Sequence, residues 1–277
     1  MSIKITTLSE NTVSSPGLLA EWGLSILVAA DGLNVLLDTG LSVSAAYNAT
    51  IMGIDLSQID KIVLSHGHAD HTGGLLHILK LMKKQVEVIA HPDIWSAKYS
   101  RTFGKNERYA GTPFSQEAAE SLGASFNLTK RETWISKNIV ASGEITMQTD
   151  YEEISPQLYV KEAGQLKPDP LRDDQALFVK SDKGLIIICG CAHRGVINTI
   201  RHAQKLTGTK TVYAVLGGTH LTGASLQRMN ATIAALKEIG VKKLGVSHCT
   251  GLPQAAILAR EFEKEFFFNN AGTCIDI

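Results

Sequence analysis

The densest group of potential metal ligands is the run from His66 to His71, in which four of the six residues are histidine or aspartate. His66 and His68 are two positions apart, so their side chains project to the same side of an extended chain. Asp70 and His71 follow at the predicted turn into a helix, where residues 72–74 (Thr-Gly-Gly) allow close backbone packing. Two histidines can therefore serve one ion while the Asp–His pair serves a neighbouring ion, which predicts a site for two metal ions.

Three more histidines stand directly after predicted strands in the second half of the chain: His193, His220 and His248. Functional loops gather at the carboxyl ends of strands in α/β sheets, so we expect these side chains to face the first cluster. Their position makes His193 and His248 candidate metal ligands. Asp70 and His220 are the predicted catalytic residues, and His220 would contact the substrate or act as a general acid.

Cys191, two residues before His193, has two interpretations. Its thiolate is a soft ligand that suits zinc, so it could bind metal itself. Alternatively it is a small buried residue beside a coordinating His193, and this second interpretation is favoured.

Alternating short strands and helices must position these side chains. In the first half, strands are predicted over 25–30, 35–37, 61–64 and 86–90, with a hairpin signal at Asp31-Gly32 and a helix over 72–84. In the second half, strands are predicted over 176–179, 185–189, 212–216 and 244–246, and helices begin at Gly195, Ser225 and Pro253. Two such α/β halves imply sheets covered by helices.

Residues from about 92 to 134 are less apolar and are predicted to form a helical lid inserted in the domain. Basic residues lie there among aromatic ones, at Lys98, Arg101, Lys105 and Arg108. The segment either holds an anionic substrate over the metals or is a solvated helical excursion. Turns at Arg194-Gly195 and Thr250-Gly251 are predicted to open helices, whose N-terminal amides attract anions. The predicted substrate-binding residues are Arg101, Lys105, Arg108 and Arg194.

The composition is that of an ordinary globular protein, 44% hydrophobic and 19% charged. The 27 basic residues balance the 27 acidic ones, which argues against a general nucleic-acid surface. No apolar run approaches the roughly 20 residues that span a bilayer, and the N-terminal segment has no signal-peptide core. The four cysteines form no Cys-x-x-Cys pair, which argues against a zinc knuckle or a thioredoxin-type motif, and their low number argues against a disulfide scaffold. We expect a cytoplasmic protein that binds neither nucleic acid nor membrane.

The motif His-x-His-x-Asp-His after a strand, with Leu-Asp38-Thr-Gly upstream, resembles the metallo-β-lactamase superfamily over essentially the whole chain. The resemblance implies one α/β domain over residues 1–277, a four-layer αββα sandwich with a two-metal site at one edge. It also implies that Asp38 is buried and supports the ligand loop. Members of the family usually carry Gly-Asp, whose aspartate bridges both ions, where this chain has Gly190-Cys191.

His248 matches the family's last metal histidine. Most members also carry a histidine between the first cluster and the Gly-Asp position, whereas this chain has none between His91 and His193. The resemblance therefore implies that His193, or a carboxylate such as Glu144 or Asp150, replaces that ligand.

The closer resemblance is to a branch of metal-dependent hydrolases, some of them similar to dihydropterin ribofuranosyl-aminobenzene phosphate synthases. The segments that carry it are 20–27, 174–177, 190–196, 216–220 and 248–251. They identify relatives more surely than substrates.

The cluster and the resemblance together predict a hydrolase that uses a hydroxide held by two divalent ions on a small ester or phosphoester. Zinc is the first choice, with manganese or iron as alternatives. His68 stands where redox-active di-iron relatives carry glutamate, which favours hydrolysis or group transfer. The alternatives are a transferase like the pterin synthases, which displaces pyrophosphate with an arylamine, and a non-catalytic metal- or ligand-binding protein. The expected partner is a phosphorylated or pterin-like small molecule, and the sequence does not predict the oligomeric state.

Overall fold

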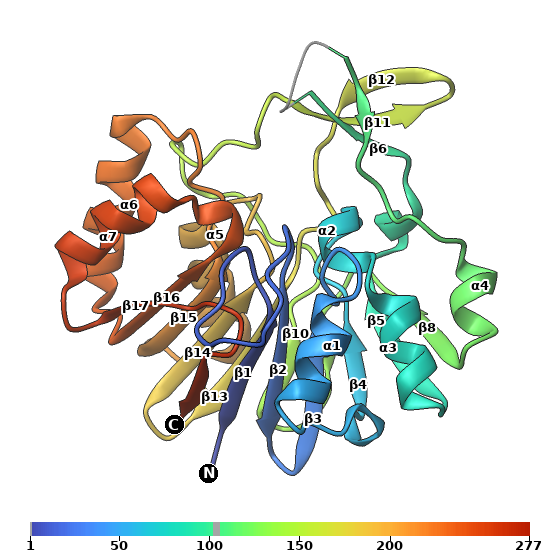
Figure 1. The fold of residues 1–277 in the computed structure, drawn as a ribbon. Helices are drawn as coiled ribbons and strands as arrows, with labels where there is room; N and C mark the ends of the chain where they lie inside the picture. The colour runs from blue at the N-terminus through green and yellow to red at the C-terminus, as the bar shows by residue number, and fades with distance from the viewer. Residues whose placement is uncertain (1, 102–105) are drawn as a thin grey trace.

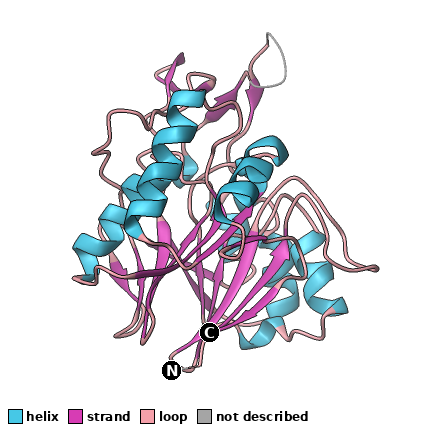
Figure 2. Cartoon of the chain, turned by 90° about the vertical axis from the view of Figure 1, so that its left-hand side faces the viewer, coloured by secondary structure: helices cyan, strands magenta, loops and turns pink. Residues whose placement is uncertain are grey.

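Two seven-stranded β-sheets lie face to face, and helices cover the outer face of each sheet (Figure 1). The computed structural model describes residues 2–101 and 106–277. In a view turned by 90°, helices stand on both sides of the strands (Figure 2). These four layers confirm the predicted αββα sandwich.

The first sheet comes from the N-terminal half of the chain together with the last strand. Its order is β18-β1-β2-β3-β4-β5-β8. Neighbours from β18 to β3 pair antiparallel, whereas β3, β4, β5 and β8 run parallel. The strands are β1 (Lys4–Ser9), β2 (Ser25–Ala30), β3 (Leu33–Leu37), β4 (Lys61–Val63), β5 (Val86–Ala90), β8 (Ala124–Leu128) and β18 (Cys274–Asp276).

The second sheet comes from the C-terminal half, in the order β17-β16-β15-β14-β13-β10-β9. Its parallel part is β14 to β17. The strands are β9 (Thr133–Trp134), β10 (Ile139–Ala141), β13 (Ala176–Ser181), β14 (Gly184–Cys189), β15 (Val212–Gly218), β16 (Lys243–Ser247) and β17 (Phe266–Phe268). The strongly apolar strands of this half lie where the sequence predicts them.

Three apolar clusters fill the spaces between the layers. In β14, Ile186 and Ile188 face the other sheet while Ile187 faces the helices, and none of the three is exposed. A strand that is buried on both faces is apolar at every position, which explains the unbroken run of β14. The outer clusters join α1, α3 and α4 to the first sheet and α5, α6 and α7 to the second.

Seven α-helices and three short 3₁₀ helices occur in the described residues. The α-helices are α1 (Ser44–Ile51), α2 (Ala69–Thr72), α3 (Leu75–Met82), α4 (Gln116–Glu120), α5 (Val196–Thr207), α6 (Leu226–Ile239) and α7 (Leu252–Phe262). The 3₁₀ helices are η1 (Leu56–Gln58), η2 (Pro92–Trp95) and η3 (His248–Thr250). None of the described helices combines the length and the apolar character needed to cross a membrane.

The segment 92–134 differs from the predicted helical lid. Its one described α-helix is the five-residue α4, while β8 and β9 join the central sheets. The strands β6 (Lys98–Ser100) and β7 (Arg108–Tyr109) pair with β11 (Leu158–Glu162) and β12 (Gln165–Pro168) in a separate four-stranded sheet at the top of Figure 1. β6 pairs with β11, far downstream in the chain, and local periodicity does not reveal such a pairing.

Candidate metal centre

Strand ends of both sheets meet at one edge of the sandwich, and each delivers part of a polar cluster. The parallel pairings place the carboxyl ends of β3 and β4 together, and those of β14, β15 and β16. The contributed residues are Asp38 after β3, the run 66–71 after β4, Cys191 and His193 after β14, His220 after β15 and His248 after β16. The structure thus brings together the six histidines, Asp70 and Cys191 that the sequence predicts for the site.

The backbone at these strand ends is strained. Four residues that are not glycine have left-handed conformations, with φ of 59° at Asp38, 50° at Ala192, 45° at His220 and 52° at His248. Each such conformation costs about 1–3 kcal/mol and persists only where the surrounding structure enforces it. Their concentration at one edge marks that edge as the functional region.

His66 lies at the middle of the first ligand group. Its Nδ1 is 2.9 Å from Ser65 Oγ, and that hydroxyl donates its proton to Asp38 Oδ2. The hydroxyl can therefore only accept from His66, so the proton of His66 is on Nδ1. The unprotonated Nε2 faces His68 Nδ1 at 2.9 Å and His193 Nε2 at 3.1 Å. Three fully buried imidazoles thus converge on one point.

Asp38 fixes the second histidine of the run in the same way. Its Oδ2 accepts a hydrogen bond of 2.7 Å from His71 Nδ1, and its Oδ1 accepts one of 2.7 Å from Ser65 N. The opposite nitrogen, His71 Nε2, then lies 3.1 Å from Cys191 Sγ. A carboxylate behind a histidine is a common way to orient a metal ligand. Asp38 is thus buried and bonded to the ligand loop, as the family resemblance implies.

A third histidine faces Asp70. His248 Nδ1 lies 2.9 Å from Asn11 Oδ1, which accepts its proton. The free Nε2 is 3.2 Å from Asp70 Oδ2, without hydrogen-bond geometry between the two atoms. Trp22 Nε1 donates to the same carboxylate oxygen at 3.0 Å, and the Trp22 ring packs on His248. Asp70 Oδ2 and His248 Nε2 therefore lie next to each other beside His71, and each has a lone pair that is available for a metal ion.

Cys191 lies between the two groups. Its Sγ belongs with His66 and His71, with His193 and His220, and with His248 and Cys249, each set within 4.8 Å. The side chain is 3% exposed. The thiol therefore occupies the central position that a bridging ligand would take.

Burial sets the protonation of the cluster. It lowers the pKa of His68 to about 3, and together with the neighbouring imidazoles it lowers the pKa of His66 and His193. Burial also acts to lower the pKa of His71, but the adjacent Asp38 carboxylate outweighs it and raises that pKa to about 9. Burial raises the pKa of Asp70, yet His248 and His71 hold it well below the ordinary value. Neutral His66, His68 and His193 and ionised Asp70 are in the forms that bind metal ions, whereas His71 must release a proton to bind one.

The donor set fits divalent metal ions. His68 Nε2, His193 Nδ1 and His248 Nε2 are buried and have no hydrogen-bond partner among the described residues. Buried polar atoms are nearly always paired, because an unpaired one costs about 1–3 kcal/mol. These nitrogens, the ionised Asp70 and the sulfur of Cys191 are ligand types that zinc favours.

A buried ion pair supports the ligand run from behind. Lys98 is 1% exposed, and its Nζ lies 2.8 Å from Asp169 and 2.9 Å from Asp173. The other oxygen of Asp173 accepts a hydrogen bond of 2.8 Å from Gly67 N, between the two ligands His66 and His68. Lys98 is thus part of the support of the ligand run and not part of a basic lid surface.

The predicted substrate-binding residues that the structure describes lie in two places, with Arg101 and Arg108 in or next to the strands β6 and β7 and Arg194 next to the ligand His193. Arg101 is exposed and pairs with Glu107 and the ring of Tyr159. Arg108 is exposed in β7, and Lys105 lies outside the described residues. Arg194 follows His193, and its backbone N donates to Asp174.

Of the carboxylates considered as mid-chain ligands, Glu144 pairs with His91 at 3.1 Å. Asp150 lines a cavity beside the cluster instead. Neither belongs to a ligand group of the described residues. His193, the other alternative for this ligand, lies beside His66, with the two Nε2 atoms 3.1 Å apart.

Sequence reasoning missed three residues that touch the centre. Trp22 and Asn11 reach Asp70 and His248 as described, and Glu10 accepts a hydrogen bond of 2.6 Å from His248 N. All three lie in the connection between β1 and β2. Their residue types and spacing carry no metal signal, so only the path of that connection places them.

Comparison with known proteins identifies the family of the chain. The family model of the metallo-β-lactamase superfamily matches residues 23–155. The 7,8-dihydropterin-6-methyl-4-(β-D-ribofuranosyl)-aminobenzene-5′-phosphate synthase of Methanocaldococcus jannaschii is 35% identical, over 99% of this chain and 96% of that protein.

Solved structures show the same fold. Tm1679, described as a metal-dependent hydrolase of the β-lactamase superfamily, matches with a TM-score of 0.86 and 29% identity over 99% of both chains. The metallo-β-lactamase fold protein YhfI from Bacillus subtilis matches over the whole of both chains with a TM-score of 0.60 and 10% identity, which shows the fold alone.

The first test concerns the carboxylate behind His71. Asp38→Asn should lower metal affinity by about 10–100-fold, because a neutral amide neither orients nor polarises the imidazole equally. In the metal-free protein, NMR should show the pKa of His71 falling from about 9. In the wild type, the pair stabilises the metal-free protein fully below pH about 6.5, and this contribution is lost as the pH rises through 9. Asp60→Asn, at an exposed carboxylate, is the control, and equal affinity in the two variants would contradict the orienting role.

The second test concerns the buried lysine. Lys98→Met should reduce the free energy of unfolding by about 3–5 kcal/mol, because Asp169 and Asp173 lose their buried partner. Urea denaturation measures this effect. Lys161→Met, at an exposed lysine of β11, should change stability by less than about 0.5 kcal/mol. Similar values for both variants would show that the ion pair does not hold the ligand run.

Proposed function

We propose that this chain, which belongs to the metallo-β-lactamase superfamily, is a metal-dependent hydrolase acting on a small phosphorylated molecule. The proposed centre holds two divalent ions, zinc in the first place and manganese or iron otherwise. The observation that carries this proposal is the convergence of one ring nitrogen each of the buried His66, His71 and His248 on one region, each ring oriented by a partner behind it.

The groups of side chains divide the ligands between two positions. His66, His68 and His193 would hold one ion. Asp70, His71 and His248 would hold the other. Cys191 is within reach of both groups, which favours the thiolate-ligand interpretation over the small-residue one.

When bound, such ions supply a Lewis acid and lower the pKa of a bound water from about 15.7 towards 7. The chain's own residues orient and protect the reacting groups. Asp70 Oδ2 accepts a hydrogen bond of 3.0 Å from Trp22 Nε1 and stays ionised, so it would orient a bound water or substrate by accepting hydrogen bonds. His220 stacks on His193 with ring centroids 4.2 Å apart and borders the neighbouring cavity, so it is placed to give a proton to a leaving group.

A second candidate function is group transfer. It is favoured by the 35% identity to the pterin-related synthase over nearly the full length of both chains. In this reaction an arylamine would displace pyrophosphate from a pterin methyl carbon. The same centre would serve, because the leaving group again needs charge stabilisation and a proton.

Metal analysis tests the centre. The wild type should contain two ions per chain after dialysis, and Cys191→Ala should lose at least one of them, because a central ligand is removed. Cys191→Asp should retain both, since carboxylate is also a zinc ligand. Cys274→Ala, at an exposed cysteine, is the matched control. If Cys191→Ala keeps its full metal content and its affinity for metal, Cys191 is not a ligand, and the interpretation of it as a small buried residue holds.

A product assay separates the two reactions. The metal-loaded protein is incubated with a dihydropterin that carries a pyrophosphate ester on its 6-methyl carbon, with and without an arylamine, and with a generic phosphodiester and a lactone. Hydrolysis predicts released alcohol or acid without need of the amine. Transfer predicts, by mass spectrometry, a pterin–amine adduct and no turnover without amine. Two bound ions with no turnover of any compound would favour a non-catalytic role.

A further inference from the structure

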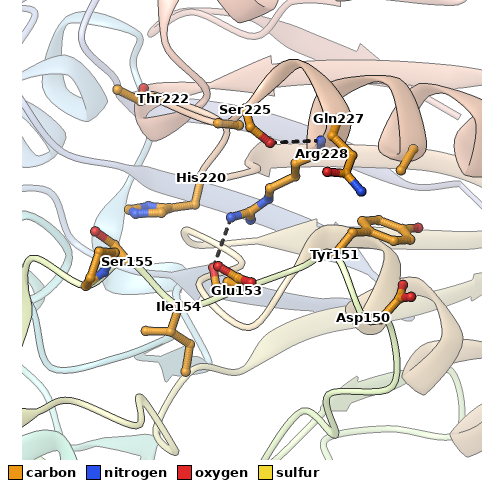
Figure 3. A pocket seen from close by; sticks show the side chains of 14 residues that line it. Asp150, Tyr151, Glu153, Ile154, Ser155, His220, Thr222, Ser225, Gln227 and Arg228 are labelled. Carbon is orange, nitrogen blue, oxygen red and sulfur yellow. Dashed lines mark hydrogen bonds between the residues drawn. The ribbon is translucent and has the colours of Figure 1, made fainter.

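A cavity of about 490 Å³ opens beside His220. Its walls are the segment 150–156 on one side and residues 220–231, the β15–α6 loop and the first turns of α6, on the other (Figure 3). His220 also touches His193 of the metal centre. The cavity is therefore the space next to the ligands in which the body of a substrate would lie.

Arg228 crosses the wall of this cavity with most of its donors unused. Its Nη1 donates to the carbonyl oxygen of Glu153 at 2.9 Å (Figure 3). Its Nε and Nη2 are buried and have no acceptor among the described residues. Arginine stays charged under all ordinary conditions, so the cavity wall contains a cation that no carboxylate of the described residues hydrogen-bonds.

The nearest buried carboxylate is already committed. Glu152 accepts hydrogen bonds of 2.8 Å from Ile197 N and Asn198 N, and Thr149 Oγ1 lies 3.1 Å from it. Both of its oxygens thus serve the N-terminus of α5. The remaining acidic residues of the lining, Asp150 and Glu153, have exposed side chains. Neither neutralises the guanidinium by a hydrogen bond.

We propose that Arg228 binds a phosphoryl group of the substrate in this cavity, and that it thereby sets the distance between that group and the bond that reacts at the metal centre. The planar guanidinium offers paired donors that match phosphate oxygens, and only the bond to Glu153 must be given up or shared when it turns into the cavity. The first turn of α6 adds a favourable field, because Ser225 and Gln227 line the same wall. This inference rests on the proposed function, because the proposed function supplies the reaction that the bound molecule undergoes.

The site differs from the predicted lid. Arg101 is held by Glu107 and Tyr159, whereas Arg228 has free donors beside the ligands. In sequence, Arg228 is an ordinary residue of a helix, which explains why no motif points to it.

Binding of phenyl phosphate, followed by NMR titration of the protein, tests this assignment. Arg228→Met should weaken binding at least about tenfold, because a hydrogen-bonded charge is lost. Arg228→Lys should weaken it less, since the charge remains without the paired donors. Arg260→Met, at an exposed arginine of α7, should bind as the wild type does. Unchanged binding in Arg228→Met would overturn the proposal.

Two further measurements distinguish phosphoryl binding by Arg228 from a structural role and from carboxylate binding. If Arg228 only anchors the 150–156 segment, Arg228→Met lowers the thermal midpoint and Arg228→Lys restores both midpoint and binding fully, which overturns the proposal. Benzoate that binds as well as phenyl phosphate would overturn the phosphoryl assignment in favour of a carboxylate. The titrations are run with metal-free and metal-loaded protein. If the metal analysis finds only one ion, the proposed two-metal centre is wrong. The comparison of the Arg228 variants in metal-free protein still tests phosphoryl binding by Arg228.

Discussion

The carboxylate of Asp38 holds two ligands of the candidate centre at once. It accepts from His71 and from the hydroxyl of Ser65, which in turn accepts from His66, so both imidazoles turn the opposite nitrogen to the centre. Asp38 has no exposed surface, and an ionised group in that position requires several donors. The donors come from the end of β4, and the strand partner β3 delivers Asp38 itself, so the pairing of these two strands sets the ligand geometry. Gly190 completes the arrangement, because a Cβ there would lie 2.1 Å from Ser65 Oγ.

The two sheets provide the rigidity that this geometry needs. Left-handed residues at the ends of β3, β15 and β16 are held against strands that are buried on both faces. Rigid strands can carry such local strain, whereas an exposed loop would relax it. The close approach of Gly73 and Gly74 to the backbone of residues 39–42 has the same effect on α2, which carries Asp70 and His71. The predicted helix over 72–84 begins only at Leu75 in α3, because residues 69–72 form the separate helix α2, which carries Asp70 and His71.

Residue type and spacing predict the part of the site that is continuous in sequence. The run from His66 to His71 can be recognised without a structure, and the strand-end rule adds His193, His220 and His248. The strong apolar strands of the sandwich are also predictable, since their burial shows in every residue. The four-stranded outer sheet is not, because its strands are short and β6 finds its partner far away in the chain. From the sequence Lys98 is interpreted as a surface lysine, because its partners Asp169 and Asp173 are both distant in the chain.

The distribution of the two sets of residues has a consequence for specificity. The ligands come from strand ends whose positions are fixed by the core, so proteins of this fold can share them while acting on different molecules. The cavity walls come instead from the 150–156 connection and from the β15–α6 loop, which carry no part of the ligand run. Substitutions there alter what is held beside His220 without moving the metal ligands. The guanidinium in that wall therefore bears more directly on which molecule this chain binds than the histidine motif does.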